Sequence, residues 1–388
     1  MPNTRSSKTL IPETKIRSVA TRLLGDERFT GRGVTIAFLD AGFYAHADLT
    51  KPRNRIKVYH DVLSREPPPH VPPPADVSSW HGMMTTAVAC GNGSLSHGRF
   101  KGLAHEAELA LVKVGSVSRI RHDDLTLGID WVCANKDRYG IRILNISAGG
   151  DYEASHLWDP LSRAAEAAIR QGIVVVCAAG NRGHDHNHRV IPPASTPAVI
   201  TVGGFDDEQV TFDKCVPYHS SYGWTIDGVQ KPELIAPAIR IAAPILPDTP
   251  TAAQASLIAE LTVADDTELH AILGEHAGVD RELDAAKHLQ PYQLRQIIAA
   301  KKGSQKVISK YYKEVDGTSF AAPIVSSIVA QMLEARPDLT PSAVKRILLA
   351  TAQRLPNVSV DRQGWGVVQP GAAVAHALEW TPGAFPHG

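Results

Sequence analysis

The sequence predicts an α/β protein: a three-layer, doubly wound parallel sheet with a helical insertion. Two observations lead to this fold class. Apolar runs of strand length recur along the chain, and helix-like segments lie between them, which is the alternation that a parallel sheet with helices on both faces requires. The apolar runs cover 34–39, 109–114, 142–147, 173–178 and 198–203.

The helices are predicted from apolar residues that recur at helical spacing. In the first of them, Leu125, Ile129 and Val132 share one face. The predicted helices are 124–138, 160–170, an apolar helix after residue 319, and a helix that Thr340-Pro341 opens and that continues through Ala352.

Residues 246–310 have a different pattern, which we interpret as a helical insertion. Acidic residues concentrate in its first half and basic residues in its second. Asp280 is suited to cap one helix, and Pro291 suits the opening turn of another. The helices predicted in the insertion are 256–275, 280–289 and 291–302.

Composition argues against nucleic acid and membranes as partners. The 40 Lys and Arg residues balance the 40 Asp and Glu residues, so no basic surface for nucleic acid is expected. No apolar run is long enough to span a membrane. The polar residues 1–9 are not followed by the apolar core of a secretory signal, and the four cysteines show no obvious pairing. These features predict a cytoplasmic protein.

The run from Asp316 to Pro323, Asp-Gly-Thr-Ser-Phe-Ala-Ala-Pro, is the most informative motif. It places Ser319 after a glycine turn, at the start of an apolar helix. There, unpaired backbone N–H groups and the helix dipole favour negative charge. A serine that attacks a carbonyl group needs this setting, because the carbonyl oxygen becomes an anion. Most serines at helix starts are only caps, so the interpretation depends on other residues.

Three other positions carry side chains that would complement Ser319. Asp40 follows the first predicted strand, at the edge where a parallel sheet opens into a crevice. His81 precedes a small, apolar helix-like run, and Asn181 follows the fourth predicted strand. Taken singly, they are better explained as a strand-end cap, a core histidine and a turn residue.

The chain order Asp40, His81, Ser319 is one of the known orders of a Ser-His-Asp triad. With further motifs it gives a resemblance: from about residue 33 to residue 377, the chain resembles the subtilisin-like serine proteases, or subtilases. The motif around Ser319 matches the GTSxAxP signature of that family in full. The other matching segments are Gly102-Leu103-Ala104, Asn145 to Gly150, Ser220 to Gly223 and Lys231 to Pro237.

The resemblance implies a serine endopeptidase that hydrolyses peptide bonds through an acyl-enzyme. Ser319 would be the nucleophile and His81 the general base and then acid, while Asp40 would orient the imidazole. Asn181 and the backbone N–H of Ser319 would form the oxyanion hole. The substrate-binding residues implied on the two walls of the cleft are Ser147, Ala148 and Gly149, and Ala178, Ala179 and Gly180.

Two other functions stay open at this point. An acyl-enzyme that is captured by an amine would make the protein a peptide-maturing transpeptidase or macrocyclase. The other alternative is a non-catalytic, peptide-binding regulator on a protease fold. Ala41 favours it weakly, because the family usually has Ser or Thr at this position. Without that hydroxyl we expect a looser hydrogen bond between Asp40 and His81.

The resemblance also divides the chain. Residues 1–32 form an N-terminal extension, residues 33–380 the subtilisin-like catalytic domain that contains the insertion, and residues 381–388 a C-terminal tail. Within the extension, Leu10-Ile11-Pro12 resembles the motif that lies across the active site of intracellular subtilisins. An ordinary strap on the domain surface is the alternative.

No cofactor is expected, although a structural calcium ion stays open. Asp48 matches a calcium-binding position of many relatives, but the loop Asn92–Lys101 that should complete the site is serine-containing and basic. The expected partner is a peptide or protein substrate. Because the insertion 246–310 leads directly to Ser319, we expect it beside the leaving-group side of the cleft. A helical lid, a docking module for a regulatory partner and a surface decoration are the alternatives.

Overall fold

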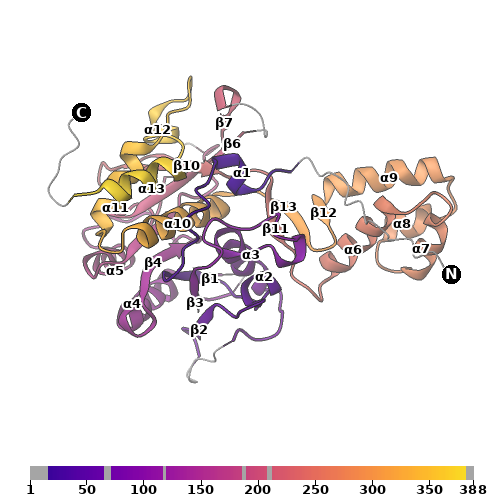
Figure 1. The fold of residues 1–388 in the computed structure, drawn as a ribbon, viewed down its shortest axis with the longest axis horizontal. Helices are drawn as coiled ribbons and strands as arrows, with labels where there is room; N and C mark the ends of the chain where they lie inside the picture. Colours follow the sequence, from indigo (N-terminus) through magenta and orange to yellow (C-terminus); the bar gives the residue numbers. More distant parts are fainter. Residues whose placement is uncertain (1–15, 65–70, 117–118, 186–188, 208–211, 382–388) are drawn as a thin grey trace, which may run out of the picture.

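The structure is a computed structural model that describes residues 16–64, 71–116, 119–185, 189–207 and 212–381. Its centre is a sheet with the strand order β10-β6-β5-β4-β1-β3-β2, in which all neighbours pair in parallel (Figure 1). The strands are β1 (Thr35–Asp40), β2 (Ile56–Asp61), β3 (Glu108–Lys113), β4 (Ile141–Ile146), β5 (Val174–Ala178), β6 (Ile200–Asp206) and β10 (Leu234–Pro237), and β7 (Val216–Pro217) pairs antiparallel with β6.

Helices cover both faces of this sheet, because its strands present apolar side chains alternately to the two sides. In β1, Ile36 and Phe38 pack into one hydrophobic cluster, whereas Ala37 and Leu39 pack into the other. The predicted three-layer α/β fold is therefore confirmed. The first cluster contains α3 (Ser79–Cys90), α10 (Thr318–Ala335), α11 (Pro341–Thr351) and α13 (Pro370–Glu379), and the second contains α4 (His122–Tyr139) and α5 (Pro160–Arg170).

The five predicted strands are present as β1, β3, β4, β5 and β6, with ends shifted by a few residues. The sequence pattern did not predict β2 and β10, which lie at the two ends of the strand order. β2 is partly exposed, and β10 has only four residues and ends at Pro237. A proline is tolerated at an edge, where its missing N–H is not needed. The partial exposure of β2 and the shortness of β10 weaken the sequence signal of each strand.

The helices of the insertion connect two strands of a second, smaller sheet. Strand β11 leads into the insertion, β12 and β13 lead out of it, and the three strands form an antiparallel sheet in the order β11-β13-β12. Residues 245–306, all of them described, form four helices rather than the predicted three. The elements are β11 (Ile241–Pro244), α6 (Pro250–Val263), α7 (Leu269–Glu275), α8 (Arg281–Ala286), α9 (Pro291–Ser304), β12 (Val307–Ser309) and β13 (Tyr312–Val315).

The single helix predicted at 256–275 is wrong, because the chain breaks between α6 and α7. Arg295, on α9, donates to the carbonyl oxygen of Leu261 at 2.7 Å and to that of Ala264 at 2.5 Å. Carbonyl groups in the last turn of a helix lack partners within the helix, so this arginine stabilises the end of α6. A tertiary contact therefore stabilises the end of α6, and the local apolar pattern could not predict where this helix ends.

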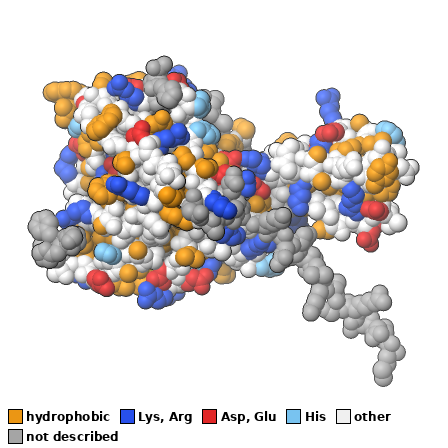
Figure 2. Space-filling view, turned by 90° about the horizontal axis from the view of Figure 1, so that it is seen from above, with side chains coloured by type: hydrophobic (Ala, Val, Ile, Leu, Met, Phe, Trp, Pro, Cys, Tyr) orange, Lys and Arg blue, Asp and Glu red, His pale blue; other side chains and the backbone are white. Residues whose placement is uncertain are grey.

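Helices α6 to α9, residues 250–304, form what we call the helical lobe. It projects from the body beside β11 and β13 in Figure 1, and Figure 2 shows it as a separate knob. Asp280 accepts hydrogen bonds from two backbone N–H groups at the start of α8, and Pro291 opens α9, so both predicted helix starts are confirmed. The lobe has its own core, made of Leu257, Leu261, Leu269, Leu273, Leu283, Ala286, Leu294 and Ile298.

The N-terminal extension is described from residue 16 onwards, and the Leu10-Ile11-Pro12 motif lies outside the described residues. Its helix α1 packs Val19 and Leu23 against the core of the body. No disulfide joins the four cysteines, all of which are described. The short elements are α1 (Val19–Leu23), α2 (Ala47–Thr50), α12 (Val360–Gln363), β8 (Gly223–Trp224), β9 (Gln230–Lys231) and the 3₁₀ helices η1 (Ser94–Ser96) and η2 (Phe212–Lys214).

The surface agrees with the balanced composition. On the face seen in Figure 2, basic and acidic side chains are interspersed over the body. Within the described ranges, every helix is too short or too polar to cross a membrane.

Candidate active site

Three strand ends bring the candidate residues to one edge of the main sheet. Strands β4 and β5 are parallel neighbours, and β1 lies on the other side of β4. Asp40 is the last residue of β1, the segment 147–150 follows β4, and the segment 179–182 follows β5. The carboxyl ends of parallel strands lie at the same edge of a sheet, so the strand order alone places these segments side by side.

His81 lies in the first turn of α3 and is hydrogen-bonded to Asp40. Its Nδ1 is 2.8 Å from one carboxylate oxygen and 2.9 Å from the other. The buried carboxylate also accepts hydrogen bonds from the backbone N–H of Ala41 at 2.8 Å and from the hydroxyl of Thr85 at 3.3 Å. The looser contact expected from Ala41 is not observed, because the backbone N–H and Thr85 orient the carboxylate instead. The sequence reading did not single out Thr85.

The environment of His81 shifts its pKa in two opposite directions. Burial would lower the pKa, because it disfavours the charged imidazolium. The charge of Asp40 and its hydrogen bond outweigh burial, so the pKa of His81 lies above its ordinary value. Since Asp40 accepts the hydrogen bond at Nδ1, the neutral ring carries its proton there and keeps Nε2 as a base. Trp80 stands edge-on to His81, with ring centroids 5.2 Å apart.

Two glycines allow α3 to approach β1 closely. A Cβ on Gly82 would lie 2.2 Å from the carbonyl oxygen of Gly42 and 2.9 Å from Cβ of Asp40. A Cβ on Gly42 would lie 2.7 Å from the carbonyl oxygen of Ser78. Atoms do not pack at these distances, so a side chain at either position would push the helix that carries His81 away from Asp40.

Ser319 lies in the first turn of α10, after Gly317, whose φ of +139° side-chain-bearing residues rarely adopt. Its hydroxyl donates to the carbonyl oxygen of Ser147 at 3.3 Å, and the hydroxyl of Ser147 donates to the carbonyl oxygen of Ser319 at 2.9 Å. The ring of the next residue, Phe320, has its centroid 5.9 Å from that of His81. The residue after Ser319 therefore packs near His81, and the Ser319 hydroxyl bonds to Ser147 rather than to the imidazole.

Asn181 is held by Thr318, the residue before Ser319. The backbone N–H and the hydroxyl of Thr318 both donate to Oδ1 of Asn181, each at 3.0 Å. This fixes Oδ1 as the acceptor, and no described residue accepts a hydrogen bond from Nδ2. The Thr318 hydroxyl in turn accepts from the backbone N–H of Gly180 at 3.2 Å. Thr318 is thus a positioning residue for Asn181, which the sequence reading missed.

A cavity of about 320 Å³ opens beside Ser319 and Asn181. Its two walls are the segments that follow β4 and β5. Gly149 faces Ile191, and a Cβ on it would lie 3.1 Å from the Ile191 side chain. Small residues keep backbone exposed on both walls, which suits an extended peptide that pairs with main chain. The lining includes all six residues implied by the resemblance: Ser147, Ala148, Gly149, Ala178, Ala179 and Gly180.

A second cavity, of about 540 Å³, lies along α3, the helix that carries His81. Trp80 and Met84 of α3 line it, together with Val315 of β13 and the segment Ile245–Thr251 at the base of the insertion. The base of the insertion therefore lies beside α3, the helix that carries His81. The helical lobe itself projects away from the body (Figure 1).

Asp48, in α2, is the residue that the resemblance matches to a calcium position. Its buried carboxylate accepts a hydrogen bond from the Tyr312 hydroxyl at 2.6 Å and from the backbone N–H of Leu95 at 3.3 Å. Burial and the charge of Asp48 raise the pKa of Tyr312, so the hydroxyl stays a donor. Over the described ranges, no three acidic, histidine or cysteine side chains gather as metal ligands would. These residues fit a tie between α2 and β13 and do not fit a calcium ion.

Comparison with known proteins gives the family. The family model described as the subtilase family, Peptidase_S8, matches residues 31–366. The chain belongs to the subtilase family. Serine protease AprX of Bacillus subtilis (strain 168) is 31% identical to this subtilase over 334 residues, which cover 83% of this chain and 62% of AprX. This subtilase thus matches less than two thirds of that relative.

Solved structures agree with this assignment at the level of the fold. Fervidolysin from Fervidobacterium pennivorans, a keratinolytic enzyme related to subtilisin, superposes with a TM-score of 0.60 at 20% identity, covering 90% of this subtilase and 43% of fervidolysin. The prenylagaramide maturation protease PagA superposes with a TM-score of 0.56 at 21% identity, covering 94% and 98% of the two chains. The predicted subtilisin-like architecture is confirmed.

Proposed function

We propose that this subtilase is a serine endopeptidase whose catalytic triad is Asp40, His81 and Ser319. The observation that carries the proposal is the hydrogen bond of 2.8 Å between His81 Nδ1 and Asp40, which leaves Nε2 available as a base. Membership of a serine protease family supports the same reaction class. The expected substrate is a peptide or protein.

In the proposed first step, His81 Nε2 takes the hydroxyl proton of Ser319 while Oγ forms a bond to the carbonyl carbon of the scissile peptide. The carbonyl electron pair moves to the oxygen, which accepts hydrogen bonds from Nδ2 of Asn181 and the backbone N–H of Ser319. His81 then protonates the amine as the C–N bond breaks, and an acyl-enzyme remains. Water, deprotonated by the same base, releases the acid. The Ser319 hydroxyl must turn from Ser147 to His81 to begin this sequence.

The test is labelling with a fluorophosphonate, which forms a stable bond with an activated serine. Ser342 offers a matched control, because it also lies in the first turn of a helix, α11, but lines neither cavity. We expect labelling of the wild type and of Ser342→Ala, and none of Ser319→Ala. Hydrolysis of casein by Ser319→Ala should fall on the order of 10⁶-fold, the size known for loss of this serine in subtilisin. Undiminished labelling of Ser319→Ala would reject the proposal.

Peptide maturation is a second candidate, favoured by the similarity to PagA over 94% of this chain. In that reaction an amine rather than water takes the acyl group. Mass spectrometry of the products separates the two, because hydrolysis adds one water to the peptide and macrocyclisation does not. The non-catalytic regulator is the alternative that positive labelling would exclude.

The cytoplasmic location and the division into extension, catalytic domain and tail remain predictions. Fractionation of cells that express the full chain tests the location. Recovery of the unprocessed protein outside the cell would contradict it.

A further inference from the structure

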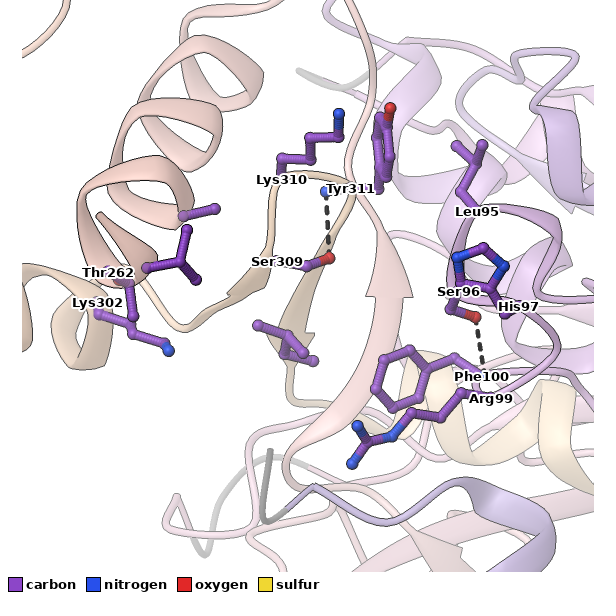
Figure 3. A pocket seen from close by; sticks show the side chains of 13 residues that line it. Leu95, Ser96, His97, Arg99, Phe100, Thr262, Lys302, Ser309, Lys310 and Tyr311 are labelled. Atoms are coloured by element: carbon purple, nitrogen blue, oxygen red, sulfur yellow. Dashed lines mark hydrogen bonds between the residues drawn. The ribbon is translucent and has the colours of Figure 1, made fainter. Parts of the chain in front are cut away.

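A groove separates the helical lobe from the body at the root of the lobe (Figure 3). Its volume is about 290 Å³. The loop Leu95–Phe100 borders it on the body side, and α6 and α9 border it on the lobe side. Strand β12 and the turn at Tyr311 complete it. It shares no lining residue with the two cavities of the candidate active site.

Lysine and arginine side chains border this groove. Figure 3 shows Lys302 and Lys310 on the side of the insertion and Arg99 on the side of the body. The lining contains no carboxylate, and no described acidic residue pairs with Lys302, which is half-buried, or with Lys310. Positive groups that face one groove repel one another, so a carboxylate bound between them is favoured.

The rest of the lining is largely apolar. Phe100 and Ile308 line the groove, and Val263 of α6 is an exposed aliphatic residue on its wall. A volume of this size, at the lower end of the roughly 300–1,000 Å³ of small-molecule pockets, suits one or two large side chains. Strand β12, which carries Ile308, is the edge strand of its sheet. An extended peptide can lie along such an edge.

Strand β13 connects the groove to the candidate active site. Tyr311, directly before the strand, lines the groove, whereas Lys313 and Val315 of the strand line the cavity along α3, the helix that carries His81. In the proposed reaction His81 protonates the leaving amine, so the C-terminal part of a substrate departs on the His81 side. From there β13 leads to the groove.

We propose that the groove binds an extended, acidic segment of the protein substrate that carries a large apolar residue, C-terminal to the scissile bond. This inference rests on the proposed protease function. Seven residues separate Tyr311 from Ser319. At about 3.3 Å per residue of extended chain, we expect the acidic segment within roughly eight residues after the scissile bond.

The experiment uses three fluorogenic peptides with the same cleaved core. One has no added motif, one carries Asp-Glu-Phe-Asp-Glu about six residues C-terminal to the scissile bond, and one carries the same motif on the N-terminal side. The proteins are the wild type, the double variant Lys302→Glu/Lys310→Glu, and the control Lys287→Glu. Lys287 is an exposed lysine of the lobe that does not line the groove.

We expect the C-terminal motif to raise kcat/KM of the wild type about tenfold or more, mainly through a lower KM, because a second contact increases the effective concentration of the scissile bond. The gain should be lost in the double variant and kept in Lys287→Glu. The peptide without the motif should be cleaved within about twofold of wild type by all three proteins. Equal kcat/KM for the three peptides, or an undiminished gain in the double variant, overturns the proposal.

Two further measurements keep the outcomes distinct. Fluorophosphonate labelling reports the protease function by itself. Should labelling fail, fluorescence anisotropy of the fluorescein-labelled motif peptide still tests the groove: the wild type and Lys287→Glu should bind it, and equal binding by the double variant overturns the proposal. If the C-terminal motif raises kcat/KM only after residues 1–15 are deleted, we would infer that this segment of the same chain occupies the groove. That result would also overturn the assignment of the groove to the substrate.

Discussion

Contacts between distant parts of the sequence stabilise the body, whereas contacts between nearby parts stabilise the helical lobe. In the body, Asp40 at the end of β1 meets His81 of α3, and Asn181 after β5 meets Thr318 of α10. These pairs join segments that are far apart in the sequence. In the lobe, the four helices pack on one another within residues 250–304, around a core of their own.

This difference separates the proposed chemistry from the proposed recognition. We expect a substitution among the contacts that hold the site to displace a reacting group, and a substitution in the lobe to leave the reacting groups in place. Just beyond the lobe, Lys306 forms an ion pair with Asp316, which precedes Gly317. The predictions below test how far the separation holds, and they begin with the largest effect on activity.

Asp40→Asn should lower kcat about 10⁴-fold, because an amide no longer holds the imidazole in the tautomer that leaves Nε2 as a base. Asp61 offers a matched control, since it ends β2 as Asp40 ends β1 but pairs with Lys113 instead. Steady-state kinetics with a short peptide check this. A similar loss in Asp61→Asn would show that any strand-end carboxylate supports the fold in this way, and would argue against a special role of Asp40.

Asn181→Ala should lower kcat about 10²–10³-fold with little change in KM, a size known for this amide in subtilisin. The amide donor acts on the oxyanion and therefore stabilises the transition state more than bound substrate. Thr318→Val removes the hydroxyl but keeps the backbone N–H that also holds Oδ1, so its loss should be smaller. An increase confined to KM would assign Asn181 to substrate binding.

The pH profile should reflect His81. Its pKa is raised above 6.5, so kcat/KM should fall about tenfold per pH unit below a midpoint that lies above 6.5. Asp40→Asn should move this midpoint down. The raised pKa also stabilises the fold: this contribution is complete below about pH 6.5 and is lost as the pH rises through the folded-state pKa. A midpoint that is the same with and without the carboxylate would contradict this account.

Leu294→Ala in the lobe core should have the smallest effect on activity. It should lower the free energy of unfolding of the lobe by about 2–5 kcal/mol, while kcat/KM for a short peptide stays within about twofold. Leu144→Ala in β4 is the matched variant in the body, because both leucines are fully buried. Urea unfolding and peptide hydrolysis, measured on both variants, should show similar destabilisation but loss of activity only for Leu144→Ala. Equal loss of activity would mean that lobe and site are coupled.

Much of the body was predictable from the sequence, because its central strands are continuous apolar runs and its motifs follow strand ends. The positions of Asp40, Asn181 and Ser319 relative to the sheet follow from that pattern. Thr85 and Thr318 were missed for one reason: each acts through a hydrogen bond to a residue that the sequence alone cannot place beside it.

In the lobe, the ends of the helices were harder to predict than the helices themselves. Its apolar residues and helix starts were recognisable, but the end of α6 depends on Arg295, which belongs to another helix. The groove at its root combines a loop of the body with two helices and an edge strand of the insertion.

By itself, the sequence determined the α/β class, the family motifs and which side chains are the candidates for the reaction, because strand and helix periodicity and short motifs are local properties. The tertiary structure alone decided which donors hold the Asp40 carboxylate, that the Tyr312 hydroxyl bonds to Asp48, and that cations from body and insertion face one groove. These features depend on close approach of distant segments, and burial of apolar surface between them sets that approach.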